Sequence, residues 1–567
     1  MSQSPKKQSF LHGAALLAIA TMVVKVIGAI YKLPLKYILN DDGFAYFSSA
    51  YEIYNLLLLI STAGLPVAMS RMISEATSLS DKAQMKKVYN TSRAIFLALG
   101  AVSTALMMVF CRELAASQEM PEASLAIFCL APCAFLMGII STYRGFFQGQ
   151  GNMIPTSVSQ VIEAVFKLGF GLLGAWLIVA LGGSIPMAAA GAILGVTVSC
   201  LVSVVYLFSV FHKQADPEVL QLRQPGFHGI TAKQLLSIAV PITIGAAGLQ
   251  LLTVIEISVY MDRLVNLLSS GQLNTPLVQE IRDNILANSK EVLTDAELYS
   301  KIAANMKGVY NFSQSIYNLP NSFITPITVS VIPAITAQLT LNNPAGAKET
   351  AESSARITSL IALPCAVGLI LLAEPIMALL GSYTGGKLTL AAQLMAILGV
   401  STFLRGAVLT TNAIMQAYNH PNIPVINMLS CGVLRLLVVY ILVGNPDINI
   451  HGAPISTLCC YAVIVVLNLF FVWKYSPEKP HYISLFAKPV LASALMGGSA
   501  WAVYGFVFRA LSDGHSVYGA NAIGTLCGIG AGVVVYGVLV IALRILRAED
   551  VKSIPHGGKI IKLLHLK

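Results

Sequence analysis

Several ionisable side chains lie inside strongly apolar runs of the sequence, where each is costly unless it is paired or hydrated. Lys25 stands in the middle of the run VVKVIG, and Glu52 lies in the next apolar run. Two interpretations stay open for Lys25. It forms an ion pair with Glu52 that joins neighbouring helices, or it faces a polar cavity and binds an anionic ligand there.

Two further acidic residues are candidates for chemistry at membrane depth. Glu163 precedes Lys167 by four residues, so in a helix the two share one face in the favourable order. They either neutralise each other or contact a substrate. Glu256 lies deep in a later run without a partner nearby in the sequence. We expect Glu256 to bind a coupling cation or to balance the cations of a cavity.

Two arginines, Arg405 and Arg435, lie in apolar runs without acidic neighbours. Cations therefore outnumber anions at membrane depth, which favours a cavity that attracts an anionic group. The guanidinium group suits phosphate in particular, because its planar fork of donors can bind two oxygens at once.

Other kinds of chemistry are not expected. Residues 381–387 match the nucleotide-binding pattern GxxxxGK, but Leu388 stands where a magnesium-binding Ser or Thr is needed. The nine cysteines include no CxxC pair, and no HExxH or Ser-His-Asp arrangement is recognisable. We therefore expect no enzyme activity, no cofactor and no metal site.

The composition indicates which elements position these residues. Of 567 residues, 56% are hydrophobic and 11% are charged, and the mean hydropathy is +0.73. Soluble domains carry about 25% charged residues. This excludes a soluble enzyme, a disordered chain and a nucleic-acid-binding protein. The net charge of +10 is typical of cytoplasmic loops that face anionic lipid.

The apolar runs predict an all-α integral membrane protein with about fourteen transmembrane helices. The expected spans are 13–35, 44–73, 93–111, 123–147, 154–181, 186–211, 233–262, 308–338, 355–380, 389–417, 423–444, 452–474, 485–509 and 518–546. The distribution of Lys and Arg places both termini in the cytoplasm and the polar insertion 263–307 outside.

Similar landmarks in the two halves suggest a repeat of six helices. Pro66 and Pro326 are each followed by Ser at the same spacing, and Gln148 and Gln416 precede corresponding links between spans. We expect two pseudo-symmetric six-helix lobes plus two C-terminal helices. The lobes are predicted at 1–230 and 231–480, and the last two helices with a basic cytoplasmic tail at 481–567.

Short motifs along the chain carry a family resemblance. They are KVIGAIYKLPL from Lys25, ISTAGLPVAMSR ending at Arg71, RGFFQGQGNMIPT with Arg144 and Gln148, the following SQVIE with Glu163, and, later, IPAIT and MQA. In this order they resemble the stage V sporulation protein B-like, polysaccharide-transporter family of the multidrug/oligosaccharidyl-lipid/polysaccharide (MOP) exporter superfamily. The resemblance extends over nearly the whole chain.

The resemblance implies a MATE-like fold around a central cavity, with helices thirteen and fourteen forming a lipid-side groove. It implies a flippase that moves undecaprenyl-diphosphate-linked sugars, such as lipid II, from the inner to the outer leaflet of a bacterial cell membrane. Candidate substrate-binding residues are Lys25, Glu52, Arg71, Arg144, Gln148, Glu163, Lys167, Arg405 and Arg435, with Glu256 as the ion-coupling candidate.

The expected partners are a lipid-linked sugar diphosphate, membrane lipids and the cell-wall synthesis machinery, and the chain is expected to act as a monomer. Alternatives stay open. A cation-coupled multidrug antiporter of the same superfamily would use the acidic residues, a flippase for capsule or teichoic-acid precursors would differ in the headgroup, and a membrane scaffold would transport nothing.

Overall fold

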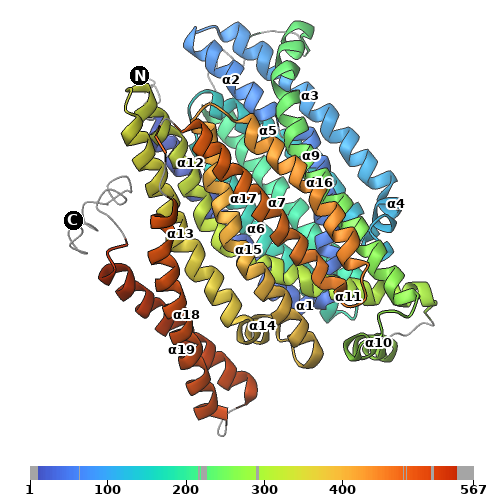
Figure 1. Cartoon of the computed structure of the whole chain (residues 1–567). Coiled ribbons are helices and arrows are strands. Elements are labelled where there is room, and N and C mark those ends of the chain that lie inside the picture. Colours follow the sequence, from blue (N-terminus) through green and yellow to red (C-terminus); the bar gives the residue numbers. More distant parts are fainter. Residues whose placement is uncertain are drawn as a thin grey trace. The chain divides into compact units, whose positions relative to one another are not determined.

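The computed structural model describes residues 10–62, 64–214, 218, 222, 227–288, 293–476, 478–479, 482–512 and 516–545. All regular elements in these ranges are helices (Figure 1). Contacts divide the chain into two compact units. Unit 1 comprises Met1–Ser269 and Ser289–Gly308, and unit 2 comprises Ser270–Asn288 and Val309–Lys567.

Unit 1 is a bundle of long helices joined by short turns. Its helices are α1 (Phe10–Thr62), α2 (Leu65–Ser78), α3 (Lys82–Val109), α4 (Cys111–Ala116), η1 (Pro121–Ala123), α5 (Ser124–Gly149), α6 (Ile154–Ala180), α7 (Ile185–Gln214), α9 (Gly229–Ser269) and the beginning of α11 (Asp295–Tyr317).

Helix α1 holds the first predicted span, 13–35, and most of the second, 44–73, which ends in α2. Its 53 residues would extend about 80 Å as a straight helix, far more than the ~30 Å hydrocarbon core of a bilayer. Asn40 divides it with φ 57° and ψ −172°, a conformation outside the right-handed and left-handed helical regions. The polar sequence Asn40-Asp41-Asp42 thus forms the turn between the two apolar halves.

Glycines bring α6 and α7 into backbone contact. A Cβ atom on Gly195 would lie 2.3 Å from the amide nitrogen of Gly171, and one on Gly174 would lie 2.6 Å from the carbonyl oxygen of Gly191. Small residues at such crossings let helices approach closely in membranes, where no hydrophobic force drives helix association. This close contact positions α6, which carries Glu163 and Lys167.

Helix α11 begins in a capping box outside the apolar spans. Thr294 and Glu297 exchange hydrogen bonds: the Glu297 carboxylate accepts from the Thr294 backbone at 2.9 Å, and these bonds hold the pKa of Glu297 below its usual value. The next two turns attach to unit 1, because Asn305 donates to Asp42 at 2.6 Å.

Unit 2 contains the remaining helices. They are α10 (Pro276–Asn288), the end of α11, α12 (Leu319–Thr340), α13 (Pro344–Leu371), α14 (Ala373–Gly381), α15 (Gly385–Ala417), α16 (Asn422–Val443), η2 (Asn449–His451), α17 (Gly452–Tyr475), α18 (Tyr482–Ser512) and α19 (Val517–Ala542). The last two pack side by side as a hairpin (Figure 1).

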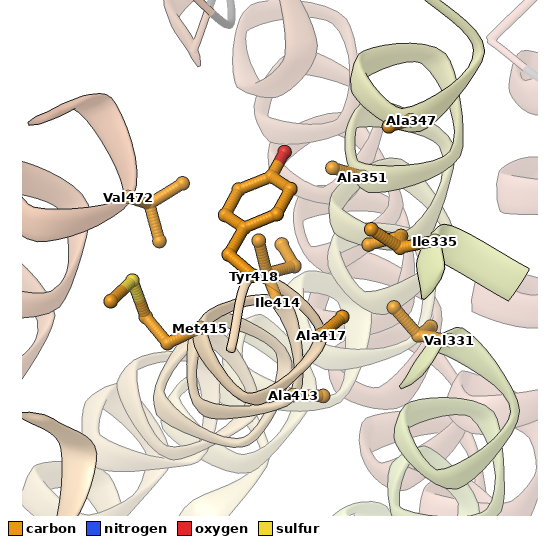
Figure 2. Packing of buried hydrophobic residues seen from close by; sticks show 10 residues of the cluster. All are labelled: Val331, Ile335, Ala347, Ala351, Ala413, Ile414, Met415, Ala417, Tyr418 and Val472. Atoms are coloured by element: carbon orange, nitrogen blue, oxygen red, sulfur yellow. The ribbon is translucent and has the colours of Figure 1, made fainter. Parts of the chain in front are cut away.

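A hydrophobic cluster joins α12, α13, α15 and α17 within unit 2 (Figure 2). Tyr418 lies among the aliphatic side chains of this cluster, and its hydroxyl reaches Ser476 at 3.3 Å. Ala351, Ile414 and Val472 belong to the cluster and also line a pocket of about 310 Å³ between α13, α15, α17 and α18.

The predicted all-α membrane fold is confirmed. Ten helices in the described part of the chain are long and apolar enough to cross a membrane, namely α3, α5, α6, α7, α13 and α15 to α19. The count of fourteen and the lobe boundaries at 230 and 480 stay predictions. The contact units themselves divide after Ser269, so α9 belongs with unit 1.

Candidate functional site

A row of aromatic rings on the second half of α1 forms one wall of the candidate site in unit 1. Phe44, Phe47, Tyr51 and Tyr54 are three or four residues apart and therefore share one helix face. Neighbouring rings in the row have centroids 5.7–6.3 Å apart. Tyr31 from the first half packs edge-on against Phe47 at 5.9 Å. The row fixes where Tyr51 presents its hydroxyl.

Lys167 of α6 contacts this aromatic wall. Its Nζ donates to Tyr51 Oη at 3.0 Å and lies 4.3 Å from the centre of the Tyr51 ring. The same ammonium lies 5.5 Å from the Tyr31 ring. Both partners are neutral, so the contacts stabilise the charge through a hydrogen bond and ring quadrupoles without cancelling it.

Arg144 of α5 is the ion-pair partner of Glu163. Its Nη2 lies 3.0 Å from Glu163 Oε2, and its Nε donates to Ser159 Oγ at 2.9 Å. Lys167 remains within Coulombic range of Glu163. The spacing of Glu163 and Lys167 therefore placed both on one face, as expected, but the carboxylate is shared with an arginine from another helix.

Glu52 takes part in a second polar group. Gln250 of α9 donates to Glu52 Oε2 at 2.9 Å, and both Lys32 and Lys307 interact electrostatically with this carboxylate. Lys32 is also within Coulombic range of Lys167, which links the two groups. Together they form the unit 1 cluster, defined as Lys32, Tyr51, Glu52, Arg144, Glu163, Lys167 and Gln250.

Cations outnumber carboxylates in the unit 1 cluster. Lys32, Arg144 and Lys167 face the two carboxylates Glu52 and Glu163. All five charged side chains are half-buried. A site of this kind retains net positive charge where water is scarce, and it can attract an anionic ligand while its own carboxylates keep it stable when empty.

The structure separates the two lysines of the first apolar run. Lys25 is an exposed side chain, whereas Lys32, two turns further along α1, is half-buried beside Glu52. Sequence reasoning named Lys25 as a candidate and did not name Lys32. It also missed Tyr51 and Gln250 as site residues. The i, i+7 spacing puts both lysines on one helix face, so it did not distinguish the half-buried Lys32 from the exposed Lys25.

The remaining sequence candidates of unit 1 lie outside this cluster's direct contacts. Arg71 on α2 is exposed, and Gln148 on α5 is half-buried with its amide 3.5 Å from the Thr156 hydroxyl. Glu256 on α9 is buried, with 7% of its surface exposed. Its depth agrees with a polar role inside the bundle.

The two candidate arginines of unit 2 lie on neighbouring helices. Arg405 on α15 donates to Tyr317 Oη at 3.0 Å and to Asn318 Oδ1. Arg435 on α16 donates to Thr457 Oγ1 at 2.9 Å. The two guanidinium groups are within Coulombic range of each other. We call them the unit 2 arginine pair.

The glycines of the GxxxxGK pattern have a structural explanation. Gly385 and Gly386 begin α15, and the Glu280 carboxylate of α10 lies against them, 3.2 Å from where a Cβ of Gly386 would stand. A carboxylate is favourable at the N-terminus of a helix. The two glycines therefore leave room for the Glu280 carboxylate of the same protein at the start of α15. No group of three or more metal-ligating side chains occurs in the described ranges.

The pocket of unit 2 has an apolar wall although it is lined in part by hydroxyl residues. Thr410 and Thr411 donate to backbone carbonyls of their own helix, and Ser359 donates to the carbonyl of Arg356. Thr358 pairs with Thr410 at 2.7 Å. Because these hydroxyls are satisfied internally, the space suits hydrocarbon.

The chain matches two known protein families. The family described as "Polysaccharide biosynthesis protein" matches residues 10–338, which is more than half of the chain. The chain belongs to the polysaccharide biosynthesis protein family. A second family, MatE, matches residues 288–441 of this family member. The predicted membership of the MOP exporter superfamily is thereby confirmed.

Relatives of this polysaccharide biosynthesis protein align over most of its length. It is 22% identical to Stage V sporulation protein B of Bacillus subtilis (strain 168), with 98% of this chain and 99% of the relative covered. It is 22% identical to Lipid II flippase MurJ of the same organism, over 86% and 87% of the two chains.

A solved structure of Lipid II flippase MurJ in an inward closed conformation has the same fold. Its TM-score is 0.61 at 16% identity, and the match covers 93% of this chain and 99% of that one. The protein is thus a multi-pass membrane protein of a superfamily of transporters and flippases.

Proposed function

We propose that this protein moves undecaprenyl-diphosphate-linked sugar precursors from the inner to the outer leaflet of a bacterial cell membrane by alternating access. The observation that carries the proposal is the cation excess of the unit 1 cluster, above all Lys167 on its neutral aromatic partners. A sugar diphosphate cannot cross hydrocarbon unaided, because its charges and hydroxyls would lose their hydration. Half-buried cations supply substitute partners.

The names of the relatives support the substrate class. One relative is a lipid II flippase, and the matching family is described by polysaccharide biosynthesis. The membrane potential would assist such movement. If about two negative charges move outward uncompensated, an inside-negative potential contributes roughly 4–5 kcal/mol per 100 mV.

The lipid tail has a place to lie in this proposal. The polyprenyl chain remains in the bilayer while the headgroup crosses, and the apolar pocket beside α18 could receive part of it. With about 310 Å³, the pocket has room for a short length of hydrocarbon, not for a whole polyprenyl chain.

The direct test is a depletion strain in which this protein is the limiting flippase. We expect lipid-linked precursors to accumulate on the inner leaflet when the protein is removed, and to disappear when it is restored. Normal precursor levels and normal envelope polymers after complete removal, with related flippases deleted, would contradict the proposal.

A cation-coupled antiporter for drugs is the second candidate. It is favoured by the buried Glu256 and by the MatE match, and it predicts drug efflux that depends on a proton or sodium gradient. The cation excess of the unit 1 cluster argues against a cationic drug as the substrate. Efflux of cationic dyes from cells that express the protein would favour this candidate over the flippase.

We also propose that both termini lie in the cytoplasm and that 263–307 lies outside. The test labels single cysteines in intact cells with an impermeant reagent. Gln272→Cys is exposed in unit 2 and should react, whereas Lys213→Cys at the end of α7 should react only after permeabilisation. The opposite pattern would reverse the orientation. Ser289, an equivalent position by sequence, lies outside the described residues.

A further inference from the structure

A stripe of amide side chains follows the end of α11 and the start of α12. Asn311, Gln314, Asn318 and Asn321 succeed one another at intervals of three, four and three residues, which places them on one helix face. The link between the two helices keeps the helical register, because the Asn318 backbone N–H donates to the Gln314 carbonyl at 3.1 Å. We call these four residues of unit 2 the amide stripe.

The amide stripe lies in a long segment without charge. Residues 308–347 contain no Asp, Glu, Lys, Arg or His, and they include the predicted span 308–338. On the other side of α11, Phe312 and Ile316 are buried, and Phe312 packs edge-on against Tyr383 with ring centroids 6.1 Å apart. The helix thus packs through apolar side chains, and its polar face needs a separate explanation, because polar groups at membrane depth are costly.

Most groups of the amide stripe lack a hydrogen-bond partner. Asn311 Nδ2, a donor, and Asn321 Oδ1, an acceptor, are buried without a partner among the described residues, and Asn321 is only 4% exposed. Gln314 is half-buried, and its side chain likewise makes no hydrogen bond within the described ranges. Asn318 accepts a hydrogen bond from Arg405. Because buried polar groups without partners are unfavourable, the unpaired amides are candidates for binding a ligand.

Neighbouring hydroxyl residues differ from the amides. Ser315, Ser322 and Thr325 each donate to the backbone carbonyl four residues earlier, at 2.8, 3.3 and 2.9 Å. Asn and Gln in membrane proteins usually hydrogen-bond to a neighbouring helix. Among the described residues of the amide stripe, only Asn318 does so. Helix association alone therefore does not explain the stripe.

The unpartnered atoms favour an uncharged ligand. An ionised phosphate only accepts hydrogen bonds, so it would suit Asn311 Nδ2 but be repelled by the acceptor Asn321 Oδ1. A hydroxyl or an acetamide group both donates and accepts, so it suits both atoms and the amide of Gln314. From Asn311 to Asn321 the stripe rises about 15 Å, so a ligand with several such groups can contact it at more than one point.

We propose that the amide stripe binds the sugar of the transported lipid through its hydroxyl and acetamide groups, and so determines which headgroups are accepted. The inference rests on the proposed function, because the sugar belongs to the substrate named there. Asn311 and Gln314 are half-buried and therefore within reach of a ligand. Asn318 offers its Nδ2 as a fixed donor, because Arg405 holds its oxygen, and Asn321 supplies an acceptor at the end of the stripe.

The experiment compares two lipids, one with a sugar and one without. Undecaprenyl diphosphate, or undecaprenyl diphosphate linked to N-acetylglucosamine, is incorporated into nanodiscs with the full-length protein, and the unfolding midpoint is measured over a range of lipid concentrations. A ligand that binds the folded state raises the midpoint according to its concentration over its Kd. We expect the sugar-bearing lipid to bind about tenfold more tightly, as two or more hydrogen bonds between neutral groups would provide.

Variants assign this preference to the amide stripe. Asn311→Leu, Gln314→Met and Asn321→Leu each remove one amide at similar shape. Each should reduce the preference for the sugar-bearing lipid about two- to tenfold, the usual effect of losing one hydrogen bond between neutral groups, and leave binding of the bare lipid unchanged. Gln314→Asn keeps an amide and should show an intermediate preference. Gln272→Leu, at an exposed position of unit 2, is the matched control and should keep the full preference.

Stability without ligand separates binding from a structural role. The three amide variants should unfold at the wild-type midpoint or above it, because an apolar group replaces a polar group that lacked a partner. A lower midpoint in all three, with equal loss of binding for both lipids, would make the amides structural and overturn the inference.

Two further results would overturn the inference and leave the proposed function standing. They are equal binding of the two lipids by the wild type, and an undiminished sugar preference in all three amide variants. Binding of neither lipid by the wild type would contradict the proposed function itself, and the inference with it.

Discussion

Replacing Lys167 by Met tests whether the ammonium of the unit 1 cluster contacts the substrate. Met retains most of the length of the side chain but removes the charge. In the wild type, Lys167 Nζ makes one hydrogen bond at 3.0 Å, to the Tyr51 hydroxyl. It lies 4.3 Å from the centre of the Tyr51 ring and 5.5 Å from the centre of the Tyr31 ring. A hydrogen bond from a charged group to a phosphate is worth about 1.5–3 kcal/mol, which corresponds to about a tenfold to 150-fold change in binding.

The assay is outward movement of a fluorescent lipid-linked sugar diphosphate in proteoliposomes, with the unfolding midpoint measured on the same preparation. We expect Lys167→Met to slow transport by about one to two orders of magnitude, and Lys167→Arg to retain much of it because the charge remains. Lys233→Met, an exposed lysine of α9, is the matched control and should transport like the wild type.

Tyr51→Phe separates a substrate contact from a purely structural bond. It removes the hydroxyl that accepts from Lys167 but keeps the ring, so a cation–π contact of about 0.5–2 kcal/mol remains. If Lys167 only joins α6 to α1, Lys167→Met lowers stability more than Tyr51→Phe, which keeps the ring contact, and both variants leave transport intact. Wild-type transport by Lys167→Met at normal abundance would therefore refute the substrate-contact role.

Three further changes test other parts of the argument. Lys32→Ala should reduce export more than Lys25→Ala, because Lys32 is half-buried beside Glu52 whereas Lys25 is exposed. If export is restored in the double variant Lys25→Glu, Glu52→Lys, Lys25 is instead half of an ion pair with Glu52. Glu256→Gln should fold but lose transport, and normal transport at all potentials and sodium levels would show that this buried carboxyl is structural. Gly195→Ala places a Cβ 2.3 Å from the backbone of α6 and should destabilise unit 1 by about 1–3 kcal/mol, seen as a lower unfolding midpoint. An unchanged midpoint would mean that α6 and α7 move apart at little energetic cost.

Much of the fold could be predicted from composition and apolar runs. A chain with 11% charged residues that lies in a bilayer must satisfy its backbone hydrogen bonds within helices. Ten helices long and apolar enough to cross a membrane are present in the described part of the chain. The sequence also indicated the family, through motifs around Arg71, Arg144 and Gln148. The α1 kink at Asn40 matches the polar gap between the first two predicted spans.

Only the tertiary structure decided which charges meet. Helical periodicity places residues on a face of one helix, but it does not tell which helix lies opposite. The spacing of Glu163 and Lys167 suggested either mutual neutralisation or contact with a substrate. In the structure, Arg144 of α5 makes the ion pair with Glu163, and Tyr51 of α1 accepts the hydrogen bond of Lys167.

Glu52 shows the same limit over a longer distance. Its amide partner, Gln250, is 198 residues away in sequence and belongs to a helix that was expected in the other lobe. Packing between helices, set by glycines such as Gly171 and Gly195 and by aromatic rings such as Tyr31, determines these neighbours. The sequence by itself determined that ionisable residues lie within apolar segments. The three-dimensional packing determined how they share their charges, because that depends on contacts between segments far apart in the chain.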